Sequence, residues 1–177
     1  MRVILLRGIA FGVVGGLLAV ACQAAAPATP TPAPVTQNLF LVADTVQGPA
    51  NLTEEESAAG AVCVQKNRFA KNEEVVWRVR VLDPATGEPM DDQALSAVTV
   101  KLPDQELAMR YGPHPRDTPV DFFWTTSFDI PESYPTGVLG YSVEAVAADG
   151  RTGTYSEFQV ASAQLTVTDE VRQVIAE

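Results

Sequence analysis

The chain is poor in the side chains that most catalytic and metal sites use. It has 177 residues but only one histidine and two cysteines. A nucleophilic catalytic site needs a nucleophile, a base and an acid that orients the base, so His114 is the only imidazole available to it. No Gly-x-Ser-x-Gly turn, phosphate-cradling glycine loop or cluster of Cys and His residues is present. The sequence therefore predicts a protein that is not an enzyme and carries no cofactor.

Basic residues are also scarce. The chain has 12 Lys and Arg against 22 Asp and Glu, which gives a formal net charge of -10. A surface of this sign repels nucleic-acid phosphates and anionic lipid headgroups. We therefore expect no nucleic-acid partner, and we assign most of the acidic residues to a solvated surface.

The longest apolar run stands at the N-terminus. Residues 8–21 form this run, Arg2 and Arg7 precede it, and Cys22 follows it. The run is short for a bilayer-spanning helix, which needs about 20 apolar residues, but it is typical of the hydrophobic part of a secretory signal. We expect residues 1–21 to be a signal peptide and the rest of the chain to lie outside the cytoplasm.

The segment after Cys22 has the composition of a tether. Residues 24–34 contain only Ala, Pro and Thr. Proline fixes φ and removes a backbone donor, so such a segment stays extended. We expect residues 22–36 to be a disordered tether that separates the signal peptide from a folded domain.

The order of basic residues, apolar run, small residues, cysteine and tether resembles that of a bacterial lipoprotein precursor. In that family a leucine-rich run ends in two small residues and a cysteine that becomes the lipidated N-terminus. The matching positions are residues 19–22, although the family usually has Leu where this chain has Ala19. The resemblance implies a lipid on Cys22 and an anchor in the cell membrane. Ordinary cleavage with secretion, and an uncleaved anchor over residues 3–21, remain alternatives.

Alternation of apolar and polar residues dominates the rest of the chain. It is clearest at residues 73–83, where Val75, Trp77, Val79 and Val81 share one face and Arg78 and Arg80 lie on the other. Residues 51–60 are expected to form a loop or a single helical turn, and residues 169–177 a helical or frayed tail. Further strands are expected at residues 38–46, 95–102, 106–111, 120–130, 138–148, 154–160 and 164–168.

About seven to nine short strands, with turn signals about 8–12 residues apart, predict an antiparallel β-sandwich over residues 37–168. Trp77 and Trp124 are its expected core anchors. Residues 130–153 contain a Tyr-Pro-x-Gly turn, an alternating strand and an Asp-Gly hairpin. This stretch resembles the late strands of bacterial immunoglobulin-like surface domains. The resemblance implies an immunoglobulin-like fold, here without the cysteine pair of antibody domains.

Three residues suggest a metal site as an alternative function. Cys63 lies in an apolar run and is expected to be a buried free thiol on a strand, and His114 lies in a proline-rich loop expected to be exposed. With Met109 they would offer thiolate, imidazole and thioether ligands, a set that suits copper. Calcium is the other ion that the sequence suggests, bound through carboxylates at loops. The acidic residues concerned are Asp83, Asp91, Asp92 and Asp149.

Three consecutive aromatic residues at positions 122–124 exceed what one face of a strand buries. Phe123 points away from the predicted core, and Tyr111 and Tyr134 would join it in a partner-binding patch if their loops converge. Alternatively, the strand is covered by other parts of the chain on both faces, and Phe123 is then buried and forms no patch. The main expectation is a membrane-tethered, non-catalytic module that binds or positions another envelope protein, a membrane complex or a polymer. The alternative is a metal-handling envelope lipoprotein.

Overall fold

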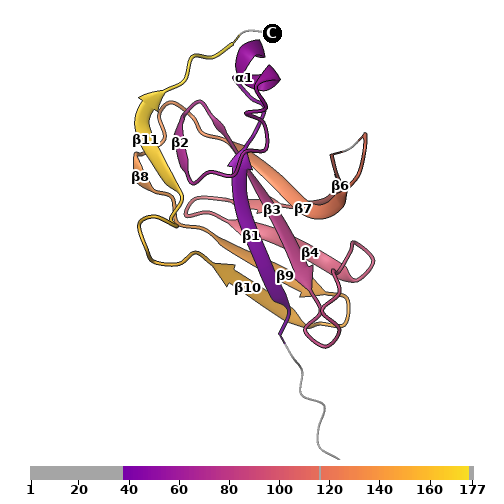
Figure 1. Ribbon diagram of the computed structural model, residues 1–177. Coiled ribbons are helices and arrows are strands. Elements are labelled where there is room, and N and C mark those ends of the chain that lie inside the picture. The colour runs from indigo at the N-terminus through magenta and orange to yellow at the C-terminus, as the bar shows by residue number, and fades with distance from the viewer. Residues whose placement is uncertain (1–37, 116, 176–177) are drawn as a thin grey trace, which may run out of the picture. The chain divides into compact units, whose positions relative to one another are not determined.

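The computed structural model describes residues 38–115 and 117–175 (Figure 1). The signal peptide expected at residues 1–21, the lipid on Cys22 and the tether over residues 22–36 lie outside the described residues and stay predictions. The all-β prediction is confirmed for the described part, because strands form nearly all of its regular structure and α1 (Glu54–Ala58) is its one short helix.

The first sheet has four antiparallel strands in the order β1-β3-β7-β6. These strands are β1 (Phe40–Gln47), β3 (Glu74–Leu82), β7 (Asp121–Asp129) and β6 (Arg110–His114). The alternation at residues 73–83 correctly predicts β3, whose every second side chain is fully buried. The other face of β3, which carries Arg78 and Arg80, points away from the core.

The second sheet also has four antiparallel strands, in the order β10-β9-β4-β5. They are β10 (Thr152–Ser156), β9 (Ser142–Ala147), β4 (Leu95–Lys101) and β5 (Glu106–Ala108). Its buried residues, such as Val100 and Val143, belong to the same core as the buried face of β3. The two sheets thus enclose one hydrophobic core in a sandwich-like arrangement.

Both tryptophans anchor this core, as expected. Trp77 is fully buried, and its ring meets that of Tyr141 edge to face with centroids 5.6 Å apart. Trp124 is 5% exposed, and its indole N–H donates to the backbone carbonyl of Met90 at 3.0 Å. Each aromatic of this size removes about 150–250 Å² from water, so the two are major contributors to folding.

The strand expected at residues 106–111 is two strands in different sheets. β5 pairs with β4 in the second sheet, β6 pairs with β7 in the first, and Met109 lies between them. The backbone N–H of Met109 donates to Val98 at 2.9 Å, and its side chain is buried. The chain therefore crosses from one sheet to the other within one residue, while the apolar alternation continues unchanged.

A third, smaller sheet is made from segments that are far apart in the sequence. It has the order β2-β11-β8, from β2 (Arg68–Lys71), β11 (Thr166–Val171) and β8 (Gly137–Val138), and β2 runs parallel to β11. Figure 1 shows these strands and α1 at the end of the domain away from the start of β1. The helical or frayed tail expected at residues 169–177 is therefore wrong at its start, because β11 continues to Val171.

Candidate functional site

The outward face of the first sheet carries a cluster of charged and aromatic side chains. Arg78 binds the carboxylate of Asp44 through two hydrogen bonds of 3.0 and 2.8 Å, and Arg80 pairs with Asp121. The two guanidinium carbons lie 5.4 and 4.6 Å from the ring centroid of Phe123. Phe123 is therefore half-buried beneath two arginines, and cation–π contacts supply its second packing surface.

A groove of about 780 Å³ opens on this face, between residues 62–63 and strand β6. Its lining comes from the end of β1, the loop before β2, and strands β3, β6 and β7. Ionisable side chains of both signs reach it, since Glu74 and Arg110 are among the lining residues. The groove is therefore a polar recess built from five separate parts of the chain.

Cys63 and His114 meet at this groove. The Cys63 Sγ lies 3.3 Å from the Nε2 atom of His114, although 51 residues separate them in the sequence. The His114 ring in turn meets Phe123 edge to face, with centroids 6.0 Å apart. The fold therefore brings the one thiol of the described residues into contact with the one imidazole of the chain.

The expectation that Cys63 is a buried thiol on a strand is wrong. Cys63 lies in a turn after Gly60, has a left-handed backbone (φ 65) and is half-buried. Its N–H donates to the carbonyl of Gln47 at 2.8 Å, so the turn is fixed to the end of β1. An apolar run therefore forms a turn here, and it presents the thiol at a groove instead of in the core.

His114 is the last residue of β6 and pairs with Asp121 of β7, where the sequence suggested an exposed loop. It is half-buried. Met109, the third suggested copper ligand, is 6% exposed within the hydrophobic core. The structure thus brings together two of the three suggested ligands and keeps the third apart. Within the described ranges, no three His, Cys, Asp or Glu side chains gather as a group that would hold a metal ion.

Three of the four carboxylates suggested for calcium bind groups of the chain itself. Asp83 and Asp149 both bind Arg151, at 3.0 and 2.8 Å. Asp91 accepts the backbone N–H groups of Gln93 and Ala94, which fixes a turn. These acids stabilise loops through bonds within the chain, so we do not propose a calcium site.

The three aromatics suggested for a partner patch lie in different places. Phe123 is on the outward face of the first sheet, whereas Tyr111 lies with Trp124 on the opposite face, with ring centroids 5.4 Å apart. Tyr134 packs against Phe128, at 5.4 Å between centroids. Phe122 is 45% exposed and stacks on Tyr111. The described residues thus offer no surface shared by Phe123, Tyr111 and Tyr134.

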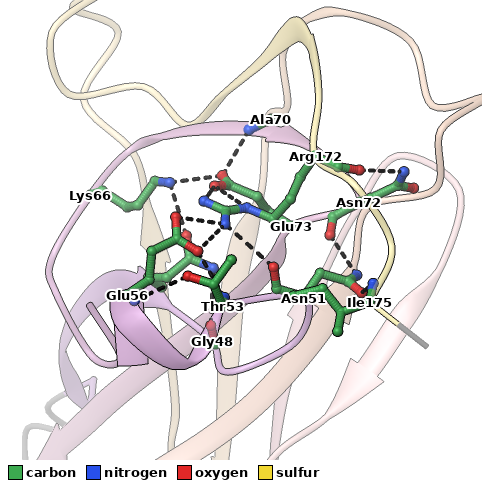
Figure 2. A network of polar contacts seen from close by, with 11 residues as sticks. Gly48, Asn51, Thr53, Glu56, Lys66, Ala70, Asn72, Glu73, Arg172 and Ile175 are labelled. Carbon is green, nitrogen blue, oxygen red and sulfur yellow. Dashed lines mark hydrogen bonds and ion pairs between the residues drawn. The ribbon is translucent and has the colours of Figure 1, made fainter. Parts of the chain in front are cut away.

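A polar network around Glu73 holds the loop before β2 through Lys66 (Figure 2). Cys63 lies earlier in the same loop. The carboxylate of Glu73 is 4% exposed and binds both Lys66, at 2.7 Å, and Arg172, at 2.8 Å. Lys66 also donates to Gln47, and Arg172 also donates to Glu56 of α1. The network therefore connects α1, the loop before β2, β1 and the C-terminal end of β11.

The pKa values in this network follow from its hydrogen bonds. The Arg172 guanidinium, helped by the Thr53 backbone N–H, lowers the pKa of Glu56 to about 2. Burial alone would raise the pKa of Glu73, but hydrogen bonds from Lys66, the Ala70 N–H and Arg172 outweigh it and lower that pKa. Both carboxylates are therefore ionised at neutral pH, and their charge is matched by the two basic side chains.

The sequence did not predict this network, because its main bonds join residues that are far apart in the chain. It suggested Cys63 and His114 as joint metal ligands, but no local pattern indicated that they are in contact. The only local signal was the capping pattern of Thr53 and Glu56 at the start of α1, in which each residue binds the backbone N–H of the other.

No helix among the described residues has the length and apolar character needed to cross a membrane. No protein-family model matches the chain, and no curated protein and no solved structure is detectably similar to it.

Proposed function

We propose that the chain is an exported lipoprotein, anchored to the cell membrane through Cys22, whose immunoglobulin-like domain binds or positions an extracytoplasmic partner without catalysing a reaction. The observation that carries this proposal is the groove on the outward face of the first sheet. It is a recess of about 780 Å³ whose lining includes residues of β3, β6 and β7. Concave sites of this size are the usual places where proteins bind ligands or partner side chains.

The strand order supports an immunoglobulin-like fold. Immunoglobulin domains of the constant type have strands in the order A-B-E-D in one sheet and C-F-G in the other. When the strands of the two large sheets are lettered in the order in which the chain forms them, β1, β3, β6 and β7 become A, B, D and E. The first sheet then has the order A-B-E-D. In the second sheet β10, β9 and β4 correspond to G, F and C, and β5 occupies the place of a strand beside C. The third sheet is an addition to this arrangement.

Tyr141 gives the fold assignment independent support. Many immunoglobulin-like domains carry a tyrosine at the start of strand F, two residues before the central buried position of that strand. Tyr141 directly precedes β9, and Val143, two residues later, is fully buried. The ring of Tyr141 also packs on Trp77 in the core.

The surroundings of His114 support a binding role over catalysis. A histidine that acts as a base in nucleophilic catalysis is usually oriented by a carboxylate. Among the described residues, the side-chain contacts of His114 are with Cys63 and Phe123, and no carboxylate hydrogen-bonds to its ring.

Site-specific photo-cross-linking tests this proposal. The cross-linking amino acid p-benzoylphenylalanine is placed at Ser127, which is exposed at the groove, and the full chain is expressed in a bacterial host that exports it. The matched control position is Ala97, which is exposed on β4 of the other sheet. We expect a discrete adduct with an envelope protein from position 127 and none from position 97.

Equal adducts from both positions, or none from either, would contradict the use of the groove. The anchor is tested separately, by fractionation of cells that produce the Cys22→Ser chain. The lipoprotein proposal expects this variant to leave the membrane fraction, and retention of the variant in that fraction would contradict it.

A further inference from the structure

We infer that Cys63 and His114 form a binding site for a soft monovalent metal ion, Cu(I), which lies at the groove with one coordination position open. This deepens the proposed function, and rests on it, because it names a ligand for the groove of the same binding module. The site joins a turn and a strand end that no sequence motif connects.

The donor atoms select the class of ion. Thiolate sulfur binds soft ions such as Cu(I) and also Zn(II), and imidazole nitrogen binds copper and zinc. Hard ions such as Mg(II) and Ca(II) take oxygen ligands, so they do not suit this pair. When Cu(I) binds, the thiol S–H bond breaks, an S–Cu bond forms and one proton leaves to solvent, with no change in oxidation state.

The distance between the donors fits one shared ion. A metal bound to sulfur at about 2.3 Å and to nitrogen at about 2.0–2.1 Å, with a tetrahedral angle between them, holds the two donors about 3.5 Å apart. The Cys63 Sγ and the His114 Nε2 are 3.3 Å apart. With the same bond lengths, this distance gives an angle of about 100° at the metal. An ion can therefore enter without a rearrangement of either backbone.

The number of protein ligands favours Cu(I) over Zn(II). Structural zinc sites have four protein ligands, and catalytic zinc sites have three. The described residues offer only two donors here, since Met109 is in the core and no third His, Cys, Asp or Glu joins the pair. Cu(I) is linear with two ligands and trigonal with three, so the bent arrangement of these two donors calls for a third. That donor comes from the groove side, either as solvent or as a group of the bound partner.

The donors are held in place before an ion arrives. The Cys63 backbone is fixed by its bond to Gln47, and the His114 ring rests against Phe123. The neighbouring cation Arg78 is matched by Asp44, with two hydrogen bonds between them. Groups held by packing and by such outer contacts bind metals more tightly than mobile ones.

Anaerobic competition with the chelator bicinchoninate, with Cu(I) as the probe, tests the site. The protein is the mature chain with Cys22→Ser, in which Cys63 is the only thiol. We expect one Cu(I) per chain and a thiolate-to-copper absorption band in the ultraviolet. We expect Cys63→Ser to abolish both, His114→Ala to weaken binding at least about tenfold, and the core variant Met109→Leu to leave binding unchanged.

Three results would overturn the inference. They are the absence of 1:1 binding, an unchanged Cu(I) affinity in His114→Ala, and binding of Zn(II) in preference to Cu(I) in parallel competition. If a variant fails to fold, a second measurement takes its place, in which bound Cu(I) protects the Cys63 thiol from alkylation. This measurement needs no substitution at the site. Equimolar Cu(I) should slow alkylation of Cys63 by iodoacetamide at least about tenfold, and alkylation at the same rate with and without Cu(I) contradicts the site.

Failure of this inference is distinguishable from failure of the proposed function. A chain that binds no Cu(I) but still gives the adduct from position 127 remains a binding module without a metal. A chain that binds Cu(I) but gives no adduct contradicts partner binding at the groove and leaves the metal site standing.

Discussion

Arg172 holds the buried carboxylate of Glu73 through hydrogen bonds of 3.1 and 2.8 Å, although 99 residues separate the two. The bond joins the end of β11 to the turn before β3. Because Glu73 also binds Lys66, the same carboxylate fixes the loop that leads from Cys63 to β2.

Replacement of Glu73 by Gln should destabilise the domain by about 2–3 kcal/mol. Loss of one partner from a buried ion pair leaves the other charge without compensation. The cost is reduced here because Lys66 and Arg172 are 28% and 22% exposed and regain some hydration. Urea unfolding measures the change. The matched control is Glu132→Gln in an exposed turn, and a loss of stability as large there would contradict the importance of Glu73.

The network also predicts a loss of stability in acid. The pKa of Glu56 in the folded state is about 2, below its ordinary value of 4.5, and the pKa of Glu73 is lowered as well. A carboxyl with a lowered pKa stabilises the folded state above its unfolded pKa, and this contribution disappears as the pH falls through the folded pKa. Stability should therefore decrease from about pH 5 toward pH 2.

Urea midpoints between pH 7 and pH 3 check this, with the Glu73→Gln variant as the comparison. The variant should lose less stability on acidification than the original chain. Glu157 acts in the opposite direction. Burial raises its pKa, and this effect outweighs the hydrogen bonds from the N–H groups of Leu165 and Tyr141, which lower it. The contribution of Glu157 to the stability of the folded state therefore increases as the pH falls. Equal acid dependence in variant and original chain would show that Glu73 does not contribute.

The two core tryptophans should respond differently to replacement by Phe. The indole N–H of Trp124 donates to Met90, whereas no protein acceptor is in reach of the Trp77 indole N–H among the described residues. Both variants create a cavity, but only Trp124→Phe also breaks a hydrogen bond. It should cost about 1 kcal/mol more than Trp77→Phe. A larger loss of stability in Trp77→Phe, measured by urea unfolding, would contradict this reasoning.

Local patterns predicted those parts of the fold in which burial alone decides the structure. Strand β3 was found because its core-facing residues alternate without a break, and Trp77 and Trp124 were found because large aromatics need burial. The crossing at Met109 could not be found in the same way. The apolar residues Leu107, Met109 and Tyr111 keep one phase through the crossing, so the sequence carries no sign that the strand changes sheets.

The candidate site was accessible to sequence reasoning only as a list of residue types. Cys63 and His114 were identified as soft donors, but their contact depends on a left-handed turn at Cys63 and on where β6 ends. Parallel pairing of β2 with β11 likewise joins segments about a hundred residues apart. Such contacts follow from the packing of the whole domain, which periodicity does not encode.

Gly153 is expected to tolerate no side chain. A Cβ atom there would lie 2.6 Å from the backbone oxygen of Leu39 and 2.6 Å from the Leu41 side chain, where β10 of one sheet meets β1 of the other. Gly153→Ala should destabilise the domain by about 1–3 kcal/mol, because backbone has to move. Gly140→Ala is the control, since nothing lies within 4 Å of a Cβ at that position. Similar thermal midpoints for the two variants would contradict the predicted clash.

Strand β1 also has a mechanical consequence. It begins just after Leu39, whose N–H bonds to Thr152, and it ends at Gln47 on the rim of the groove. A pull between the N-terminal side and a partner in the groove would thus act along the length of the strand. Eight residue pairs join β1 to β3 side by side. Their hydrogen bonds would share the load in shear, so they would not break one after another. Under the proposed anchoring through Cys22, the bonds between β1 and β3 would carry such a pull in shear.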